Sequence, residues 1–180
     1  GLKTVATTGS AGATGRSVRS VQAIMPQSGV HCFEYVFTRP DASTDGADLG
    51  GGHIVGVATA TAPPKEKYNE LDGVYAAEAW WGMQDLADRA LFAGTEYTQR
   101  ALPASASRNK HGRAFGCGDR IGFAIDTDKG TMQFFRNGER IVGATVSGVP
   151  TNEPLHLVAS PRRNGTAVTV SRPEVEYEEA

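Results

Sequence analysis

The sequence predicts an all-β fold, a sandwich of two antiparallel β-sheets. Short apolar stretches alternate with turn residues along most of the chain, which is the pattern of a sandwich or barrel. Both turns of a three-stranded meander are explicit between residues 119 and 142, and no long amphipathic helix pattern appears. Only residues 76–92 have a helix-favouring composition, and Trp80-Trp81-Gly82 interrupts it. With 180 residues, 39% of them hydrophobic, the chain can bury the core that two packed sheets require.

The first expected strands lie in the N-terminal half. Residues 30–37 alternate, so Phe33, Tyr35 and Phe37 should share one face. Residues 54–60 are apolar enough for a central strand. Side chains alternate along a strand, so Trp80 and Trp81 cannot both point inward. We place Trp81 in the core and expect Trp80 to be partly exposed.

The clearest strands lie in the C-terminal half. In residues 119–126 apolar residues alternate with small ones, and residues 126–130 supply a turn. The alternation resumes from Met132, and Asn137-Gly138 is a strong hairpin signal. Two more strands are expected at 155–159 and 166–171, joined by a loop at 160–165. The residues that should be largely buried are Phe33, Ile121, Phe123 and Phe134.

The two ends of the chain differ from its middle. Residues 1–16 are rich in Gly, Ala, Ser and Thr, and we expect a loosely ordered arm or one edge strand there. Residues 173–180 are mostly glutamate, which predicts a solvated acidic tail. The sandwich domain should therefore occupy residues 17–172, as a monomeric module within a larger protein.

Composition argues against several classes of function. A formal net charge of -2 disfavours a dedicated nucleic-acid binder, because neutralising phosphates needs a basic surplus. No apolar run approaches the roughly 20 residues that span a bilayer, so we expect no membrane segment. Cys32 and Cys117 are too few for a disulfide framework, which favours free thiols and an intracellular, cytoplasmic setting.

Catalytic and metal-binding patterns are also weak. Asp126, Asp128 and Gly130 resemble the start of a calcium loop, but its twelfth position is Asn137 rather than a bidentate glutamate. A polar turn is therefore expected there. The four histidines lack partners at metal-ligand spacing, and the acids show no paired arrangement for hydrolysis. We expect no catalytic residue, no metal and no cofactor, and we interpret the basic residues Arg108, Lys110, His111 and Arg113 as a solvated loop.

Five motifs in order resemble the SPRY (B30.2) domain family over about residues 17–172. They are Gly29-Val30-His31-Cys32-Phe33-Glu34, Val55-Gly56-Val57-Ala58, Trp81-Gly82, Gly118-Asp119-Arg120-Ile121-Gly122 and the stretch from Asp126 to Gly138. The resemblance implies a concanavalin-like jelly roll that binds a peptide of a partner protein.

Within that family, Ala58–Pro63 followed by Tyr68-Asn69-Glu70-Leu71 looks closest to the SOCS-box and F-box branch. The resemblance implies a substrate receptor or scaffold of a ubiquitin-ligase type, with a shallow peptide pocket. Tyr68 and Leu71 would form one side of the pocket, and Arg162, Arg163, Asn164 and Gly165 the other. Arginines stand where the branch has an aromatic, so the partner should be acidic. The alternative is a lectin-like carbohydrate-binding sandwich, with Trp80 as its candidate platform.

Overall fold

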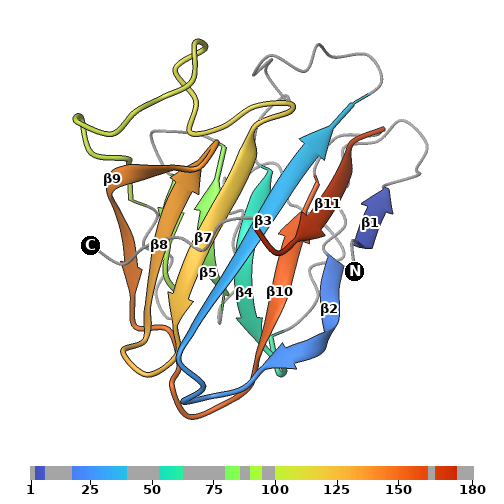
Figure 1. Cartoon of the computed structure of the whole chain (residues 1–180), viewed down its shortest axis with the longest axis vertical. Helices are drawn as coiled ribbons and strands as arrows, with labels where there is room; N and C mark the ends of the chain where they lie inside the picture. Colours follow the sequence, from blue (N-terminus) through green and yellow to red (C-terminus); the bar gives the residue numbers. More distant parts are fainter. Residues whose placement is uncertain are drawn as a thin grey trace, which may run out of the picture.

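The computed structural model describes residues 18–39, 53–62, 80–85, 90–94, 100–161 and 165–173, together with the backbone of Lys3–Ala6. These residues form two antiparallel sheets packed face to face (Figure 1), and none of them is helical. The predicted all-β sandwich is therefore confirmed. No helix in the described part of the chain is long and apolar enough to cross a membrane.

The six-stranded sheet has the order β1-β11-β3-β7-β8-β9, and the five-stranded sheet has the order β2-β10-β4-β5-β6. The strands are β1 (Lys3–Ala6), β2 (Val18–Ile24), β3 (Val30–Thr38), β4 (Ile54–Thr59), β5 (Trp80–Gln84), β6 (Leu91–Phe92), β7 (Arg120–Asp126), β8 (Thr131–Arg136), β9 (Glu139–Ser147), β10 (Leu155–Ser160) and β11 (Ala167–Ser171). The predicted meander is β7-β8-β9. At its second turn, Asn137 and Gly138 both have a positive φ, of 54° and 87°, as a two-residue hairpin turn requires.

Aromatic side chains fill the space between the sheets. Tyr35, Phe123 and Phe134 are completely buried, and the Phe123 ring lies 5.8 Å from the Tyr35 ring and 6.3 Å from the Phe134 ring. Ile121 is also completely buried. Phe33 packs against this cluster with its ring 5.7 Å from Phe123, but it is only partly buried. The predicted core is thus confirmed, with Phe33 at its margin.

One hydrogen bond joins the two sheets through the core. The hydroxyl of Tyr35, on β3, donates to the carbonyl oxygen of Gly56, on β4, over 3.3 Å. Gly56 lies opposite Gly82 of β5. A Cβ at Gly56 would meet the carbonyl oxygen of Trp81 and lie 2.8 Å from the Cα of Gly82. Since both obstacles are backbone atoms, the strands approach this closely only because both residues are glycine.

Trp80 corrects one prediction from the sequence. Its ring was expected to be partly exposed, but it is only 3% exposed. The alternation itself holds, because Trp81 joins the main core while Trp80 belongs to a second buried cluster on the opposite face of the five-stranded sheet. That second cluster consists of Ile54, Ala58, Ala62, Trp80, Phe92 and Val158. Both faces of this sheet are therefore buried at its centre.

The turn at Asp126 is the polar turn that the sequence predicts. One carboxylate oxygen accepts the backbone N–H groups of Asp128 and Lys129, both at 2.9 Å, and the other accepts the Lys129 ammonium at 2.8 Å. The side-chain hydrogen bond from Lys129 is the main reason why the pKa of Asp126 lies below its usual range. Cys32 and Cys117 form no disulfide, as expected.

Candidate binding surface

Several connections meet at one end of the sandwich, which we call the loop end. The N–H of Gly118 donates to the Phe37 carbonyl at 2.9 Å, and the N–H of Ala114 donates to the Asp85 carbonyl at 2.9 Å. The N–H of Asp85 in turn donates to the His53 carbonyl at 3.1 Å. These bonds bring together the end of β3, the start of β4, the end of β5 and the start of β7. Because Ala167 pairs with Thr38, the start of β11 lies there too.

Gly165 is the predicted site residue that the structure describes, and it lies at the loop end. Its φ of 78° is in the left-handed region, it is exposed, and no atom lies within 4 Å of the place where a Cβ would stand. A partner's backbone could therefore approach it closely. The other five predicted site residues, Tyr68, Leu71, Arg162, Arg163 and Asn164, lie outside the described residues.

The described neighbours of Tyr68 limit how it could reach the loop end. Ala62 and Trp80, which bracket its segment, lie at the opposite end of β4 and β5, because Ala58 pairs with Trp80 while Ile54 pairs with Gln84. Tyr68 follows Ala62 by six positions, which span at most about 20 Å. The six residues of β4 span a similar length. A pocket shared by Tyr68 and residues 162–165 thus requires a nearly extended path along the sheet.

A layer of buried polar residues supports the loop end. Its members are His53, Gln84, Asp85, Ser160 and Thr166, each no more than 1% exposed. The backbone N–H of His53 donates to a carboxylate oxygen of Asp85 at 3.1 Å, and the His53 ring packs edge-on against Phe37, 5.3 Å between centroids. Buried, hydrogen-bonded groups of this kind hold a fixed geometry. The loops at this end therefore stand on a rigid base.

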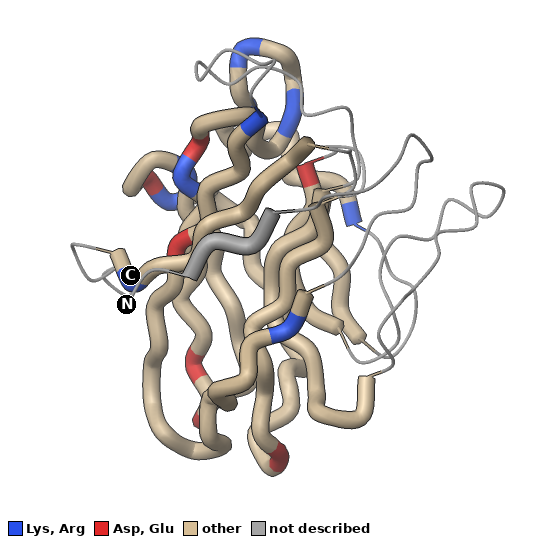
Figure 2. Tube along the Cα trace, turned by 90° about the vertical axis from the view of Figure 1, so that its right-hand side faces the viewer, with Lys and Arg blue, Asp and Glu red and all other residues tan. Residues whose placement is uncertain are grey.

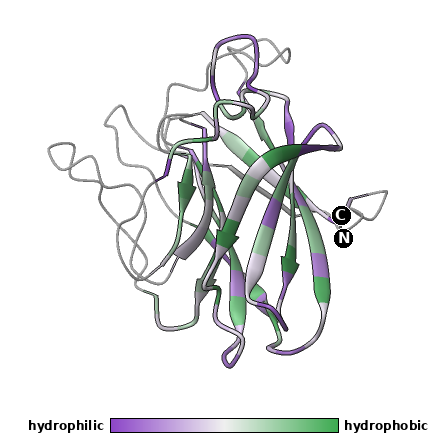
Figure 3. Ribbon diagram, turned by 90° about the vertical axis from the view of Figure 1, so that its left-hand side faces the viewer, coloured by the Kyte–Doolittle hydropathy of each residue, from purple (hydrophilic) through white to green (hydrophobic). Residues whose placement is uncertain are grey.

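Residues 108–113 form an ordered loop that projects from this end, and we call them the basic loop (Figure 2). The side-chain oxygen of Asn109 accepts the N–H groups of His111 at 3.0 Å and Arg113 at 2.9 Å. The backbone N–H of Asn109 donates to the Arg113 carbonyl at 2.9 Å, and Gly112 has a φ of 71°. Arg108, Lys110 and His111 are exposed, and the loop is strongly hydrophilic (Figure 3).

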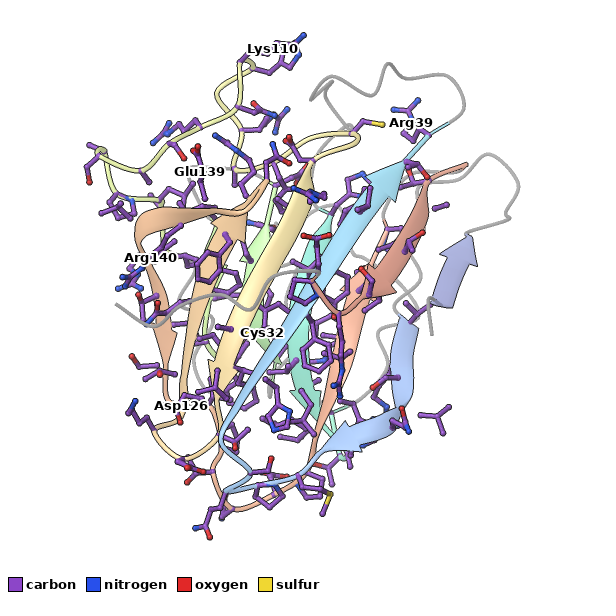
Figure 4. The ribbon with its side chains drawn as sticks, in the orientation of Figure 1. Cys32, Arg39, Lys110, Asp126, Glu139 and Arg140 are labelled. Atoms are coloured by element: carbon purple, nitrogen blue, oxygen red, sulfur yellow. The ribbon has the colours of Figure 1, made fainter. Side chains whose placement is uncertain are left out.

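Two further arginines lie at the starts of β7 and β9, while the acids described at these strand ends are mostly withdrawn from the surface. Arg140 is exposed, and the Arg120 side chain is 50% exposed although it lies 4.0 Å from Glu34. Glu34 itself is only 12% exposed. Asp119 is buried, where it accepts the Gly116 N–H at 2.8 Å and the Asn137 amide at 2.9 Å. Of the acids described at this end, the one that stays exposed is Glu139 (Figure 4).

The sequence reasoning treated this loop only as solvated charge. What it missed is the order of the loop, which depends on Asn109 and Gly112. The available signal was an Asn followed three residues later by a Gly, because Asn side chains cap turns and Gly adopts positive φ. His53 and Asp85 were also missed as parts of the supporting layer, since each looks unremarkable in a single sequence.

Comparison with known proteins agrees with this architecture. The family model described as "SPRY domain" matches residues 44–173. This chain therefore belongs to the SPRY domain family, whose members are generally protein–protein interaction modules. A search of curated protein sequences returned no match.

Three solved structures illustrate the likeness of fold. The SPRY domain of human HERC1 is 19% identical, with a TM-score of 0.60, covering 92% of this chain and 87% of that one. The PSpry domain of TRIM65 is 19% identical, with a TM-score of 0.57, covering 87% of this chain and 70% of that one. A human SPRY domain is 18% identical, with a TM-score of 0.56, covering 98% and 99% of the two chains. At these identities the likeness shows the fold alone.

Proposed function

We propose that this SPRY domain binds a short extended segment of a partner protein at its loop end, and that its role is recognition rather than catalysis. The observation that carries the proposal is Gly165, which is exposed and left-handed, with open space above it, beside a layer of buried polar residues. Rigid strands that present variable loops are the usual arrangement for recognition.

The proposed pocket combines Tyr68 and Leu71 with Arg162, Arg163, Asn164 and Gly165. A tyrosine offers an apolar ring and a hydroxyl, a leucine offers an apolar wall, and the two arginines suit a carboxylate on the partner. The resemblance to the SOCS-box and F-box branch supports a finer proposal. The domain would act as substrate receptor or scaffold in a ubiquitin-ligase type of complex, as a monomeric, cytoplasmic module of a larger protein.

Carbohydrate binding has less support. A lectin-like site needs an exposed aromatic platform or a polar site held by calcium. Trp80, the candidate platform, is only 3% exposed. Asp126, at the start of the calcium-like motif, has its carboxylate committed to the turn and to Lys129. Within the described residues, no three His, Cys, Asp or Glu side chains form a group that could hold a metal.

The test is a partner search followed by matched variants. A library of disordered peptides displayed on phage is selected against the 180-residue chain, and the affinity of the enriched peptides is measured by calorimetry. Tyr68→Ala should weaken binding by about 2 kcal/mol or more, as a hot-spot tyrosine does. Val142→Ala, at a side chain that is 62% exposed on β9, is the control and should leave the affinity unchanged. Enriched peptides whose affinity ignores Tyr68, Leu71 and Arg163 alike would refute the pocket, and a positive glycan array would favour the lectin alternative.

A further inference from the structure

The basic loop has no role in the pocket proposed above, yet it is ordered and highly charged. We propose that Arg108, Lys110 and His111 of the basic loop form a second contact surface for a stretch of the partner rich in Asp and Glu. This inference rests on the proposed function in one respect, that the acidic stretch belongs to the same partner as the peptide in the pocket.

Charge is the first argument. Among the residues that the structure describes in the basic loop and at the neighbouring strand ends, the exposed charged groups are basic except Glu139, whereas Glu34 and Asp119 are buried or nearly so. Asp119 is buried and accepts two hydrogen bonds within the protein, so its carboxylate is not presented to a partner. A surface with this imbalance attracts carboxylates, and it also steers an acidic partner during encounter.

Preorganisation is the second argument. Asn109 fixes the loop from within, and the Ala114 backbone anchors its base by donating to Asp85 and accepting from the Arg136 guanidinium at 3.2 Å. The backbone that carries the basic side chains is thus already ordered before a partner arrives. Binding therefore loses less conformational entropy than it would with a mobile loop.

Position is the third argument. Phe37 and Thr38 lie between the two surfaces, with Gly118 hydrogen-bonded on one side and β11 paired on the other. Two neighbouring spacings within a sheet, about 10 Å, separate β11 from Gly118, and the basic loop ends five residues before Gly118, so a peptide longer than four extended residues is needed to reach it. Figure 4 shows Lys110 and Arg39 at this same end of the molecule. One peptide can therefore reach both the pocket and the basic loop.

Other partners of a basic surface fit less well. Single-stranded nucleic acid is held by stacking on aromatic rings, but the exposed large hydrophobic residues of the described part of the chain are Val21, Met25, Val30 and Val142. An anionic membrane is favoured by apolar side chains that insert beside the charges. Residues 108–113 consist of basic residues, one asparagine and one glycine, so nothing in the loop would insert.

The test uses the 180-residue chain and a fluorescein-labelled peptide of alternating Glu and Ser, followed by fluorescence polarisation at low salt. The double variant Arg108→Gln, Lys110→Gln should bind this probe about three- to tenfold more weakly, because each exposed charge contributes modestly. The matched control, Lys129→Gln with Arg172→Gln, also removes one lysine and one arginine charge, but at positions outside the basic loop. It should change the affinity by less than about twofold. The urea midpoints of both double variants verify folding.

Each alternative outcome is decisive. Equal weakening by both double variants, or equal binding of a Gln/Ser peptide, would overturn the proposed surface. So would tighter binding of oligothymidylate or of phosphatidylserine vesicles than of the acidic probe. A loss confined to Arg163→Gln would place the acidic contact in the pocket and refute this inference while the proposed function stands. The probe offers no anchor for the pocket, so its binding tests the basic loop separately from the pocket. If Tyr68→Ala left the affinity for the phage-selected peptides unchanged, that result would therefore refute the pocket alone.

Discussion

The hydroxyl of Tyr35 offers a sharp test of how the two sheets are held together. The side chain is completely buried and donates its single hydrogen bond to Gly56 across the core. Tyr35→Phe removes that bond and leaves the ring in place. A buried hydrogen bond between neutral groups contributes about 1 kcal/mol to the free energy of unfolding. At pH 7 the variant should be less stable than the wild type by about that amount.

The difference in stability between the wild type and Tyr35→Phe should reverse at high pH. Burial raises the pKa of Tyr35 far above its ordinary value, so the folded chain keeps the phenol proton. The unfolded chain releases it above about pH 10, and stability therefore falls as the pH rises. The resulting penalty is about 0.4 kcal/mol at pH 10 and about 1.4 kcal/mol at pH 11. The phenylalanine variant lacks this penalty, so it should become the more stable chain between about pH 10.5 and 11.

Urea unfolding at a series of pH values measures both effects. Trp80 and Trp81 are both buried, so tryptophan fluorescence should report the transition. Other tyrosines and lysines titrate in the same range, but they are common to both chains and largely cancel in the difference. The m-values of the two chains should agree, since the surface exposed on unfolding is the same. A stability difference that stays constant to pH 11 would show that the hydroxyl reaches water, and the reasoning would be wrong.

Three further predictions concern the sandwich itself. Gly56→Ala should lower the free energy of unfolding by about 3 kcal/mol or more, because backbone atoms block the new methyl. A fall of the urea midpoint by less than a tenth of its wild-type value would contradict this. Phe123→Ala should cost about 3 to 5 kcal/mol, whereas the exposed Val142→Ala should stay within about 0.5 kcal/mol; similar costs would refute the core assignment. Asp126→Ala should cost about 1 to 3 kcal/mol and Asp126→Asn less, since Asn still accepts the turn N–H groups. The Lys129 hydrogen bond lowers the Asp126 pKa, so the wild type should lose the stability that this carboxylate contributes as the pH falls below about 3.9, whereas Asp126→Asn should not. If the free energies of unfolding of the two chains fell in parallel with decreasing pH, the Asp126–Lys129 interaction would be refuted.

The parts of the fold that the sequence predicts are those governed by local rules. Ile121, Phe123 and Ile125 alternate with small or polar neighbours, and Asn137-Gly138 tolerates positive φ, so the meander follows from adjacent residues. Strand β2 was not predicted. Only Ile24 of its seven residues is buried, and the strand lies at the edge of the five-stranded sheet. Such a strand lacks the periodic apolar signal that marks central strands.

Features that depend on contacts between distant parts of the chain could not be predicted from the sequence. Alternation places Trp80 and Trp81 on opposite faces of the sheet, but it does not predict whether the outer face is covered by other residues. The pairing of Val170 with Tyr35 joins residues far apart in the sequence, and no local pattern encodes it. The order of the basic loop was hidden for a different reason. The loop conformation depends on Asn109 and Gly112, whereas the prediction was based on the charged residues of the loop.

The construction of the basic loop has a consequence for how binding preferences could be altered. The backbone of this loop is held by Asn109, Gly112 and main-chain hydrogen bonds, while Lys110 and His111 are exposed. Random substitution at these two positions should therefore change what the surface attracts without changing its shape. Replacing both with aspartate would bring the formal charge of residues 108–113 from +3 to zero, with His counted as neutral, and would weaken their attraction for acidic peptides. The position thus suits directed evolution of new selectivities on an unchanged scaffold.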